Sequence, residues 1–224
     1  MMMNLFSIFD PSTSINFSLN WFSSLFILIL LPQIYWLVPS RYVLINYLLL
    51  NLLSNEFKML MNKKLNLMNM IIYMGIFMMI MLNNLMGMFP YIFTSSSHLL
   101  FSLSLSLTMW LSFMLFGWIM NMNHMFTHLV PQGTPTFLMS FMVIIETISN
   151  LIRSGTLAVR LSANMIAGHL LMTLISSTGT SLSMIILVFM LLSQCMLILL
   201  ELSVAMIQAY VFTVLSSLYS VESS

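Results

Sequence analysis

Long apolar stretches separated by shorter polar segments dominate the order of residues along this chain. A helix needs about 20 consecutive, mainly apolar residues to cross the hydrocarbon core of a bilayer. Five stretches approach or exceed that length, at about residues 21–38, 68–89, 99–119, 137–175 and 183–218. The pattern therefore predicts an all-α membrane protein with about five membrane-embedded helices.

Residues 41–66, between the first two stretches, form a different kind of segment. They hold four of the six basic residues of the chain, namely Arg41, Lys58, Lys63 and Lys64. The apolar residues here do not form a spanning pattern, so we expect an additional helix that lies in the membrane interface. Because basic loops remain on the cytoplasm-equivalent side, the N-terminus is predicted to lie outside and the C-terminus inside.

The last two apolar stretches are longer than a membrane crossing requires. Residues 137–175 would form a helix of roughly 58 Å, whereas the hydrocarbon core is only about 30 Å thick. Either the helix breaks, with Gly155 or Gly168 as a bend point, or it lies far over in the membrane. We expect one membrane domain over residues 1–224. Residues 1–66 form an N-terminal span and the interfacial segment, residues 67–136 two spans, and residues 137–224 a long, strongly tilted hairpin.

The composition leaves little room for a soluble domain. Of the 224 residues, 60% are hydrophobic and only 5% are charged, whereas soluble domains carry roughly 25% charged residues. A net charge of +1 gives no sign of a nucleic-acid partner. Residues 1–14 contain Asp10 but no lysine or arginine, unlike a secretory signal or a mitochondrial transit peptide. The single cysteine, Cys195, lies in an apolar run, where we expect it to pack in the core.

Polar residues in the two long stretches recur every seven positions. This spacing places them on one face of each helix. In the first stretch Glu146, Arg153 and Arg160 are spaced by seven, and Asn150 and Asn164 join them at a spacing of four. In the second stretch Gln194, Glu201 and Gln208 are spaced by seven. An antiparallel hairpin would bring such residues together in pairs, and the matching pairs are Glu146 with Glu222, Arg160 with Gln208, and His169 with Glu201. A connecting loop centred near Gly179 would align the two helices differently. The alignment that these pairs require is offset from it by about one turn of helix.

Arg160 is the central feature of this arrangement, because arginine cannot lose its charge by deprotonation. A charged side chain near the bilayer centre costs about 2.5 to 3.5 kcal/mol on insertion scales, so such residues mark ion pathways. Titratable groups are predicted on both sides of Arg160 along the hairpin. This arrangement suits two proton routes that the fixed charge of Arg160 keeps separate. Two other functions remain open: an ion-coupled secondary transporter with Arg160 as an anion anchor, and a structural membrane subunit. If the chain is a structural subunit, the Arg160 side chain forms an ion pair or extends to the membrane interface. The other polar side chains then only form hydrogen bonds between helices.

Other chemistry has little support in the sequence. No P-loop pattern is present, so we expect no catalytic site for ATP in this chain. His124 and His128 are four residues apart but have no third type of ligand nearby, so no metal site is predicted. His169 is the only histidine deep in a predicted helix, which argues against haem. We therefore expect neither a metal nor a cofactor.

Five motifs, in this order, resemble the a subunit family of rotary ATP synthases in its mitochondrial form. The motifs are NNLMGMFPY at residues 83–91, HLVPQGTP at 128–135, IIETIS at 144–149, AVRLSANMIAGHLL at 158–171 and ELSVAMIQAYVFT at 201–213. With the order of the apolar segments, the resemblance covers nearly the whole chain. The abundance of methionine and scarcity of lysine are similar to insect members of the family.

This resemblance implies a function, partners and residue roles. A member of the family conducts protons in the mitochondrial inner membrane, with its N-terminus toward the intermembrane space and its C-terminus toward the matrix. It passes protons to a ring of c subunits and so couples proton flow to ATP synthesis. Its other partners are the peripheral stalk, further membrane subunits and the lipid bilayer.

By the same resemblance, Arg160 faces the ring and keeps two half-channels apart. His169 and Glu201 belong to the half-channel from the intermembrane space, and Glu146 and Glu222 to the exit toward the matrix. Asn164 and Gln208 match polar positions near the arginine. Several family members carry Asp at the position of Glu222, and the family implies no role for Arg153.

Overall fold

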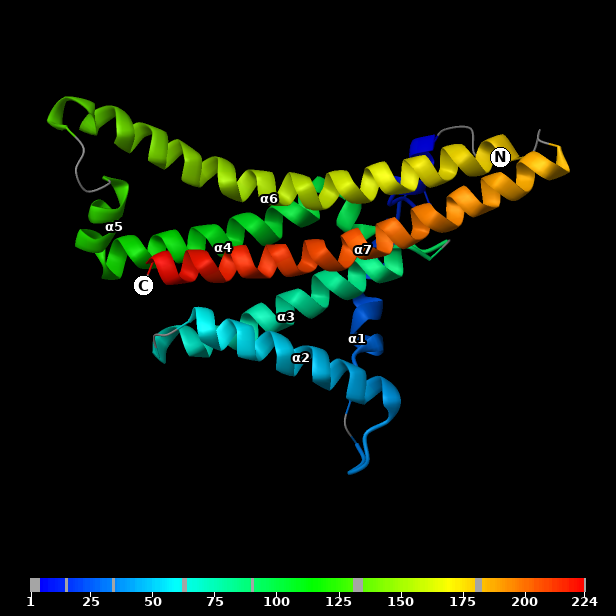
Figure 1. The fold of residues 1–224 in the computed structure, drawn as a ribbon, viewed down its shortest axis with the longest axis horizontal. Helices are drawn as coiled ribbons and strands as arrows, with labels where there is room; N and C mark the ends of the chain where they lie inside the picture. Colours follow the sequence, from blue (N-terminus) through cyan, green and yellow to red (C-terminus); the bar gives the residue numbers. More distant parts are fainter. Residues whose placement is uncertain are drawn as a thin grey trace.

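The computed structural model describes residues 5–14, 16–33, 35–61, 64–89, 91–130, 135–179 and 183–223. Every regular element in these ranges is a helix (Figure 1), which confirms the predicted all-α class. The 3₁₀ helices are η1 (Leu5–Phe9), η2 (Leu19–Leu25) and η3 (Ser95–Ser97). The α-helices are α1 (Phe26–Leu30), α2 (Arg41–Leu60), α3 (Lys64–Gly87), α4 (Leu99–Met120), α5 (Met122–Leu129), α6 (Thr136–Thr178) and α7 (Met184–Ser223).

Four of the described helices are long and apolar enough to cross a membrane, within α3, α4, α6 and α7. They coincide with the second to fifth apolar stretches predicted from the sequence. The first stretch differs, because helix is continuous there only over Leu19–Leu30 and does not extend to residue 38. Pro32 accounts for the early end, since proline disfavours the helical conformation at the residue before it and has no N–H to donate.

The basic segment forms the predicted additional helix, α2. Ser40 caps its first turn, where the hydroxyl oxygen accepts a hydrogen bond from the Val43 N–H at 3.4 Å. The helix buries Leu53 and Phe57, and the Phe57 ring lies 6.2 Å from the Tyr73 ring of α3. Its location in the membrane interface stays a prediction. Lys63 lies outside the described residues, so the structure locates only part of this basic cluster.

The helices α6 and α7 are continuous over 43 and 40 residues. No break occurs at Gly155 or Gly168, so the first of the two alternatives for the long stretch is wrong. Figure 1 shows instead that α6 curves gently along its whole length. At 1.5 Å per residue the two helices are about 60 to 65 Å long, roughly twice the thickness of the hydrocarbon core.

The core lies where α2, α3, α6 and α7 meet. Its largest fully buried side chains include Phe57, Tyr73, Ile80, Leu161 and Phe212. The second half of α7 presents small residues to this core, all of them buried: Ala205, Ala209, Thr213, Ser216, Ser217 and Ser220. Small side chains allow close helix packing in membranes, where van der Waals contact replaces the hydrophobic driving force.

The first half of α7 has a different environment. Figure 1 shows the turn end of the α6–α7 hairpin extending beyond the other helices, so little of the chain packs against it. Cys195 lies in this region and is exposed, so its predicted place in the core is wrong. An apolar run predicts a membrane helix but does not reveal which of its faces touch protein.

Candidate functional site

The middle of the hairpin brings together Arg160 of α6 and Gln208 of α7. The Gln208 side-chain amide donates a hydrogen bond to the backbone carbonyl of Arg160 at 2.7 Å, which confirms the predicted pairing of these positions. The contact is to the backbone carbonyl of Arg160 and not to its guanidinium. Gln208 is buried, whereas the Arg160 side chain is exposed at the surface of α6.

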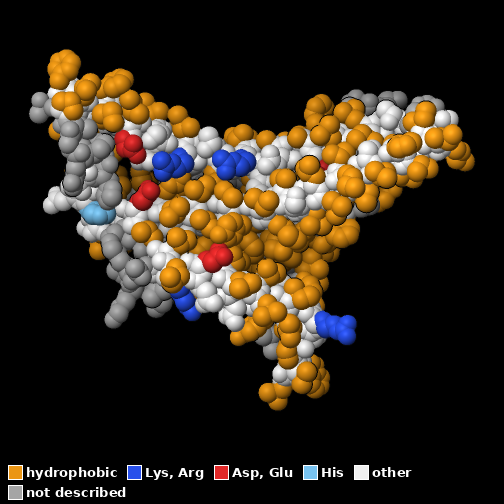
Figure 2. Space-filling model, in the orientation of Figure 1, with side chains coloured by type: hydrophobic (Ala, Val, Ile, Leu, Met, Phe, Trp, Pro, Cys, Tyr) orange, Lys and Arg blue, Asp and Glu red, His pale blue; other side chains and the backbone are white. Residues whose placement is uncertain are grey.

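The Arg160 guanidinium has no ion pair with any carboxylate of the described residues. Because its charge is permanent and not cancelled within this part of the chain, it remains available to a group outside it. Figure 2 shows basic side chains along α6, with acidic side chains beside them toward one end and hydrophobic and uncharged ones elsewhere. Asn164, one helical turn further on, is also exposed. The arrangement can therefore present a fixed positive charge to a partner helix.

Beyond Arg160, toward the turn, lies a cavity of about 230 Å³, here called the outer pocket. It is lined by Asn164, His169 and Glu201 together with apolar residues of α6 and α7. The side chain of Glu201 lies directly against Gly168: a Cβ at that position would be 2.8 Å from the Glu201 carboxyl carbon. The predicted proximity of His169 and Glu201 is thus confirmed, and Gly168 makes the space for the carboxylate.

Two polar atoms of the outer pocket are buried without a hydrogen-bond partner among the described residues. They are Nε2 of His169 and Oε1 of Glu201. Buried polar atoms in proteins are nearly always paired, with protein or with water. A pocket that offers one nitrogen and one carboxylate oxygen without protein partners is therefore suited to water and to proton transfer.

The N-terminal segment also contacts His169, which the sequence did not predict. The Phe9 ring meets the His169 ring edge to face, with centroids 6.5 Å apart and planes at 82°. Asp10 follows directly, and its carboxylate accepts hydrogen bonds from the Ser12 N–H at 3.2 Å and the Ser12 hydroxyl at 2.9 Å. No sequence spacing links residue 9 to residue 169, because this contact depends on how the chain returns to α6.

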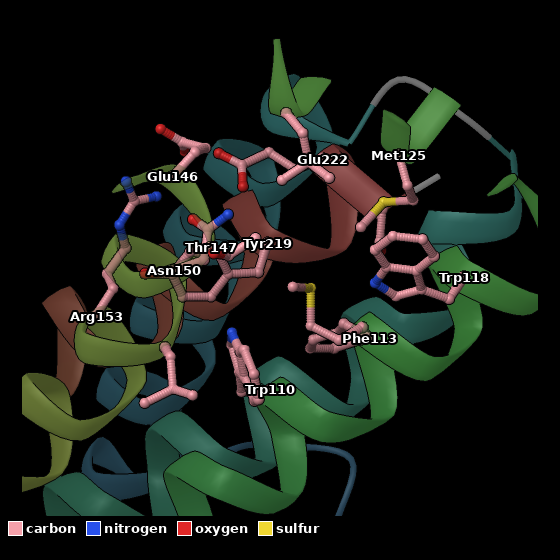
Figure 3. A pocket seen from close by; sticks show the side chains of 14 residues that line it. Trp110, Phe113, Trp118, Met125, Glu146, Thr147, Asn150, Arg153, Tyr219 and Glu222 are labelled. Atoms are coloured by element: carbon pink, nitrogen blue, oxygen red, sulfur yellow. The ribbon is translucent and has the colours of Figure 1, made fainter. Parts of the chain in front are cut away.

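A second cavity, of about 480 Å³, lies at the other end of the hairpin and is here called the inner pocket. Side chains from α4, α5, α6 and α7 surround it (Figure 3). Glu146 and Glu222 both line it, which confirms that these two predicted positions share a site. Arg153 lines it as well, with its guanidinium carbon 5.7 Å from the centre of the Tyr219 ring. Trp110, Trp118 and Tyr219 are lining residues that the sequence analysis did not identify.

The two pockets have no lining residue in common. Along α6, Arg160 lies about 21 Å beyond Glu146 and about 13 Å before His169, at 1.5 Å per residue. The structure therefore has the predicted order along the hairpin. Glu146 and Glu222 lie on one side of Arg160, and His169 and Glu201 lie on the other. Figure 3 shows Glu146 and Glu222 among the side chains that line the inner pocket.

Comparison with known proteins gives the family. The family model described as "ATP synthase A chain" matches residues 15–221. The chain belongs to the ATP synthase A chain family. Curated relatives named ATP synthase subunit a are 61% identical in Locusta migratoria and 57% in Aedes aegypti, each over 224 residues. The relative of that name in Drosophila melanogaster is 59% identical over 222 residues. Each alignment covers 99% of both proteins.

The match to the ATP synthase A chain family includes the whole of α6 and nearly all of α7. Arg160, His169, Glu201, Gln208, Asn164 and Glu146 all lie inside it, and Glu222 lies one residue beyond its end. Phe9 precedes the matched range. The resemblance inferred from the five motifs is therefore confirmed over nearly the full length of the chain.

Proposed function

We propose that this chain is the proton-conducting a subunit of a mitochondrial ATP synthase. The observation that carries the proposal is the exposed Arg160, without a carboxylate partner among the described residues, between two separate polar pockets on one pair of continuous helices. Family membership supports this function and does not favour the secondary transporter. The deciding experiment is ATP-driven proton pumping by assembled complexes that carry Arg160→Ala.

In the proposed mechanism, protons reach a carboxylate of a neighbouring c-ring through the outer pocket. His169 and Glu201 offer the proton-binding atoms there, and the neutral ring carboxyl can then face lipid. After nearly a full rotation this carboxyl meets Arg160, whose charge favours the ionised form. The proton then leaves past Glu146 and Glu222. A potential of about 100 mV supplies roughly 2.3 kcal/mol for each charge moved.

The partners follow from the faces that the chain leaves exposed. The outer face of α6, with Arg160 and Asn164, is proposed to meet the c-ring, while Gln208 fixes the hairpin register behind it. The remaining apolar surface is left for lipid, the peripheral stalk and other membrane subunits. ATP chemistry is assigned to other subunits of the complex.

The proposed location is the mitochondrial inner membrane, with several membrane crossings. The N-terminus faces the intermembrane space and the C-terminus the matrix, because the basic residues gather between α1 and α3. In Figure 1, α1 runs across the direction of α6 and α7. If α1 stands upright in the bilayer, the hairpin is strongly tilted, which also accommodates its length.

Glu201→Gln and His169→Ala are expected to slow proton uptake by several-fold each, and more in combination. Both side chains line the outer pocket and carry its unpaired polar atoms. Each substitution therefore removes one group that can take up a proton. Water can partly replace a single group, which leaves residual flux. Proton flux is measured by quenching of a pH-sensitive dye in inner-membrane vesicles. Unchanged flux in both single variants and in the double variant would show that the two residues are structural.

Phe9→Ala is expected to expose the His169 ring. The Phe9 side chain lies against the imidazole, so its removal opens one side of His169 to reagents from the outer surface. The measurement is the rate of His169 carbethoxylation by diethyl pyrocarbonate in the assembled complex, followed by mass spectrometry, and we expect an increase of several-fold. Phe6→Ala is the matched control, because Phe6 lies in the same 3₁₀ helix but is 68% exposed. Equal rates in the two variants would contradict a covering role for Phe9.

A further inference from the structure

Arg153 is the one arginine on the polar face of α6 for which the proposed mechanism has no use. It lies seven residues before Arg160 and seven after Glu146, so the three side chains share one helix face. Its side chain is exposed, yet it also lines the inner pocket. Arg153 therefore stands between the ring-facing arginine and the two carboxylates that are proposed to release the proton.

The Tyr219 ring determines where the Arg153 charge is held. The guanidinium carbon lies 5.7 Å from the ring centre, within the range of a cation–π interaction. Such an interaction restrains the guanidinium but leaves its charge uncancelled, unlike an ion pair. No described carboxylate forms an ion pair with Arg153. The charge is thus fixed in position and still acts on its surroundings.

The groups around Arg153 define what its charge can influence. From α6, Glu146 faces the inner pocket, and from α7 Glu222 and Tyr219 do so (Figure 3). The side chains from α4 and α5 that line the pocket are aromatic or aliphatic, including Trp110, Trp118 and Met125. His124 is on α5 but is not a lining residue. Apart from Tyr219, the titratable side chains that line the inner pocket are therefore two carboxylates and one guanidinium.

We propose that Arg153, held over the Tyr219 ring, is a positioning residue that keeps Glu146 and Glu222 ready to accept the departing proton. This inference rests on the proposed proton-conducting function and names a residue that controls its release step. Nearby positive charge favours the ionised form of a carboxylate, and the apolar walls of the pocket strengthen that influence. Arg153 acts through the two carboxylates and does not itself bind the proton.

The release step then proceeds in two transfers. The O–H bond of the ring carboxyl breaks, and its proton passes along a chain of water molecules to form a new O–H bond on the carboxylate of Glu146 or Glu222. That side chain becomes a neutral carboxylic acid, while the ring carboxylate is left ionised opposite Arg160. The acid then gives the proton to water on the matrix side and returns to its ionised form. Arg153 keeps its charge throughout and opposes retention of the proton.

The test uses assembled complexes in inner-membrane vesicles, with ATP synthesis measured as a function of pH on the matrix side. In Arg153→Gln the positive charge is absent from the inner pocket, so we expect proton release to require a more alkaline matrix. We expect the profile to move to higher pH by about 0.5 to 1 unit, with the rate recovering at alkaline pH. Arg153→Lys keeps the charge and should move the profile less.

Two further variants test the role of the ring and of charge in general. Tyr219→Leu removes the surface on which the guanidinium rests and should move the profile in the same direction as Arg153→Gln. Tyr219→Phe keeps the aromatic face and should move it less than Tyr219→Leu. Lys58→Gln is the matched control, because it removes an exposed positive charge on α2, outside the inner pocket, and should leave the profile in place.

An Arg153→Gln complex that assembles and keeps the original pH profile overturns the proposal. An equal loss of rate at every pH also overturns it, because that result indicates only a packing role. These outcomes are independent of the proposed function itself, which fails if Arg160→Ala leaves coupled pumping intact. A shifted profile in Arg153→Gln together with lost pumping in Arg160→Ala supports both.

Discussion

Arg160→Ala is expected to abolish ATP-driven proton pumping while the complex still assembles. The fixed charge that keeps the two proton routes apart is lost, so protons can pass between them without driven rotation of the ring. The fold is expected to survive for a specific reason. Gln208 bonds to the backbone carbonyl of residue 160, which alanine retains, and the Arg160 side chain is exposed. Pumping is measured by dye quenching in vesicles, and assembly by native gel electrophoresis.

The controls separate the loss of charge from the loss of structure. Gln208→Leu removes the hydrogen bond between the helices but leaves the guanidinium in place, so it should reduce pumping less than Arg160→Ala. Arg160→Lys restores a charge without the planar guanidinium and should recover only part of the activity. With the barrier gone, passive proton conduction should continue in the Arg160→Ala complex. Coupled pumping at the normal rate in an assembled Arg160→Ala complex would refute the mechanism.

The sequence predicts the helices and the levels of the hairpin well, because both depend on regular spacing. Apolar length identifies α3, α4, α6 and α7, and heptad spacing places Glu146 and Arg160 on one face. The pairing of Arg160 with Gln208 follows from an antiparallel register, which the 2.7 Å hydrogen bond confirms. These features are local or repeat along one direction of the chain, so single-sequence patterns contain them.

Contacts between distant segments are what the sequence could not reveal. The Phe9 ring on His169 and the Tyr219 ring under Arg153 join residues whose separation follows no helical period. The continuity of α6 was also undecided, since glycine permits a bend without requiring one. Cys195 is exposed because the hairpin extends beyond the other helices, and an apolar run cannot show which of its faces meets protein.

Gly168→Ala is expected to lower proton flux by several-fold, up to the loss seen in Glu201→Gln, because small displacements of a reacting group have large effects on rate. A Cβ at this position would lie 2.8 Å from the carboxyl carbon of Glu201 and 3.0 Å from its Cγ, both closer than van der Waals contact. The flexible Glu201 side chain is the part that yields, so the carboxylate moves away from its place beside His169. The fold should tolerate the change, because the strain falls on the end of one side chain.

Gly75→Ala is the matched control for this prediction. It adds the same methyl group to a helical glycine of α3, where nothing lies within 4 Å of the new Cβ. Both substitutions remove the conformational freedom of glycine and raise helix propensity by about 1 kcal/mol, so this gain cancels from the comparison. Proton flux and assembly are measured in vesicles for both variants and for Gly168→Ala combined with Glu201→Gln. If Glu201 carries the effect, the double variant should be little slower than Glu201→Gln alone. Equal flux in Gly168→Ala and Gly75→Ala complexes would show that the position of the Glu201 carboxylate does not limit proton uptake.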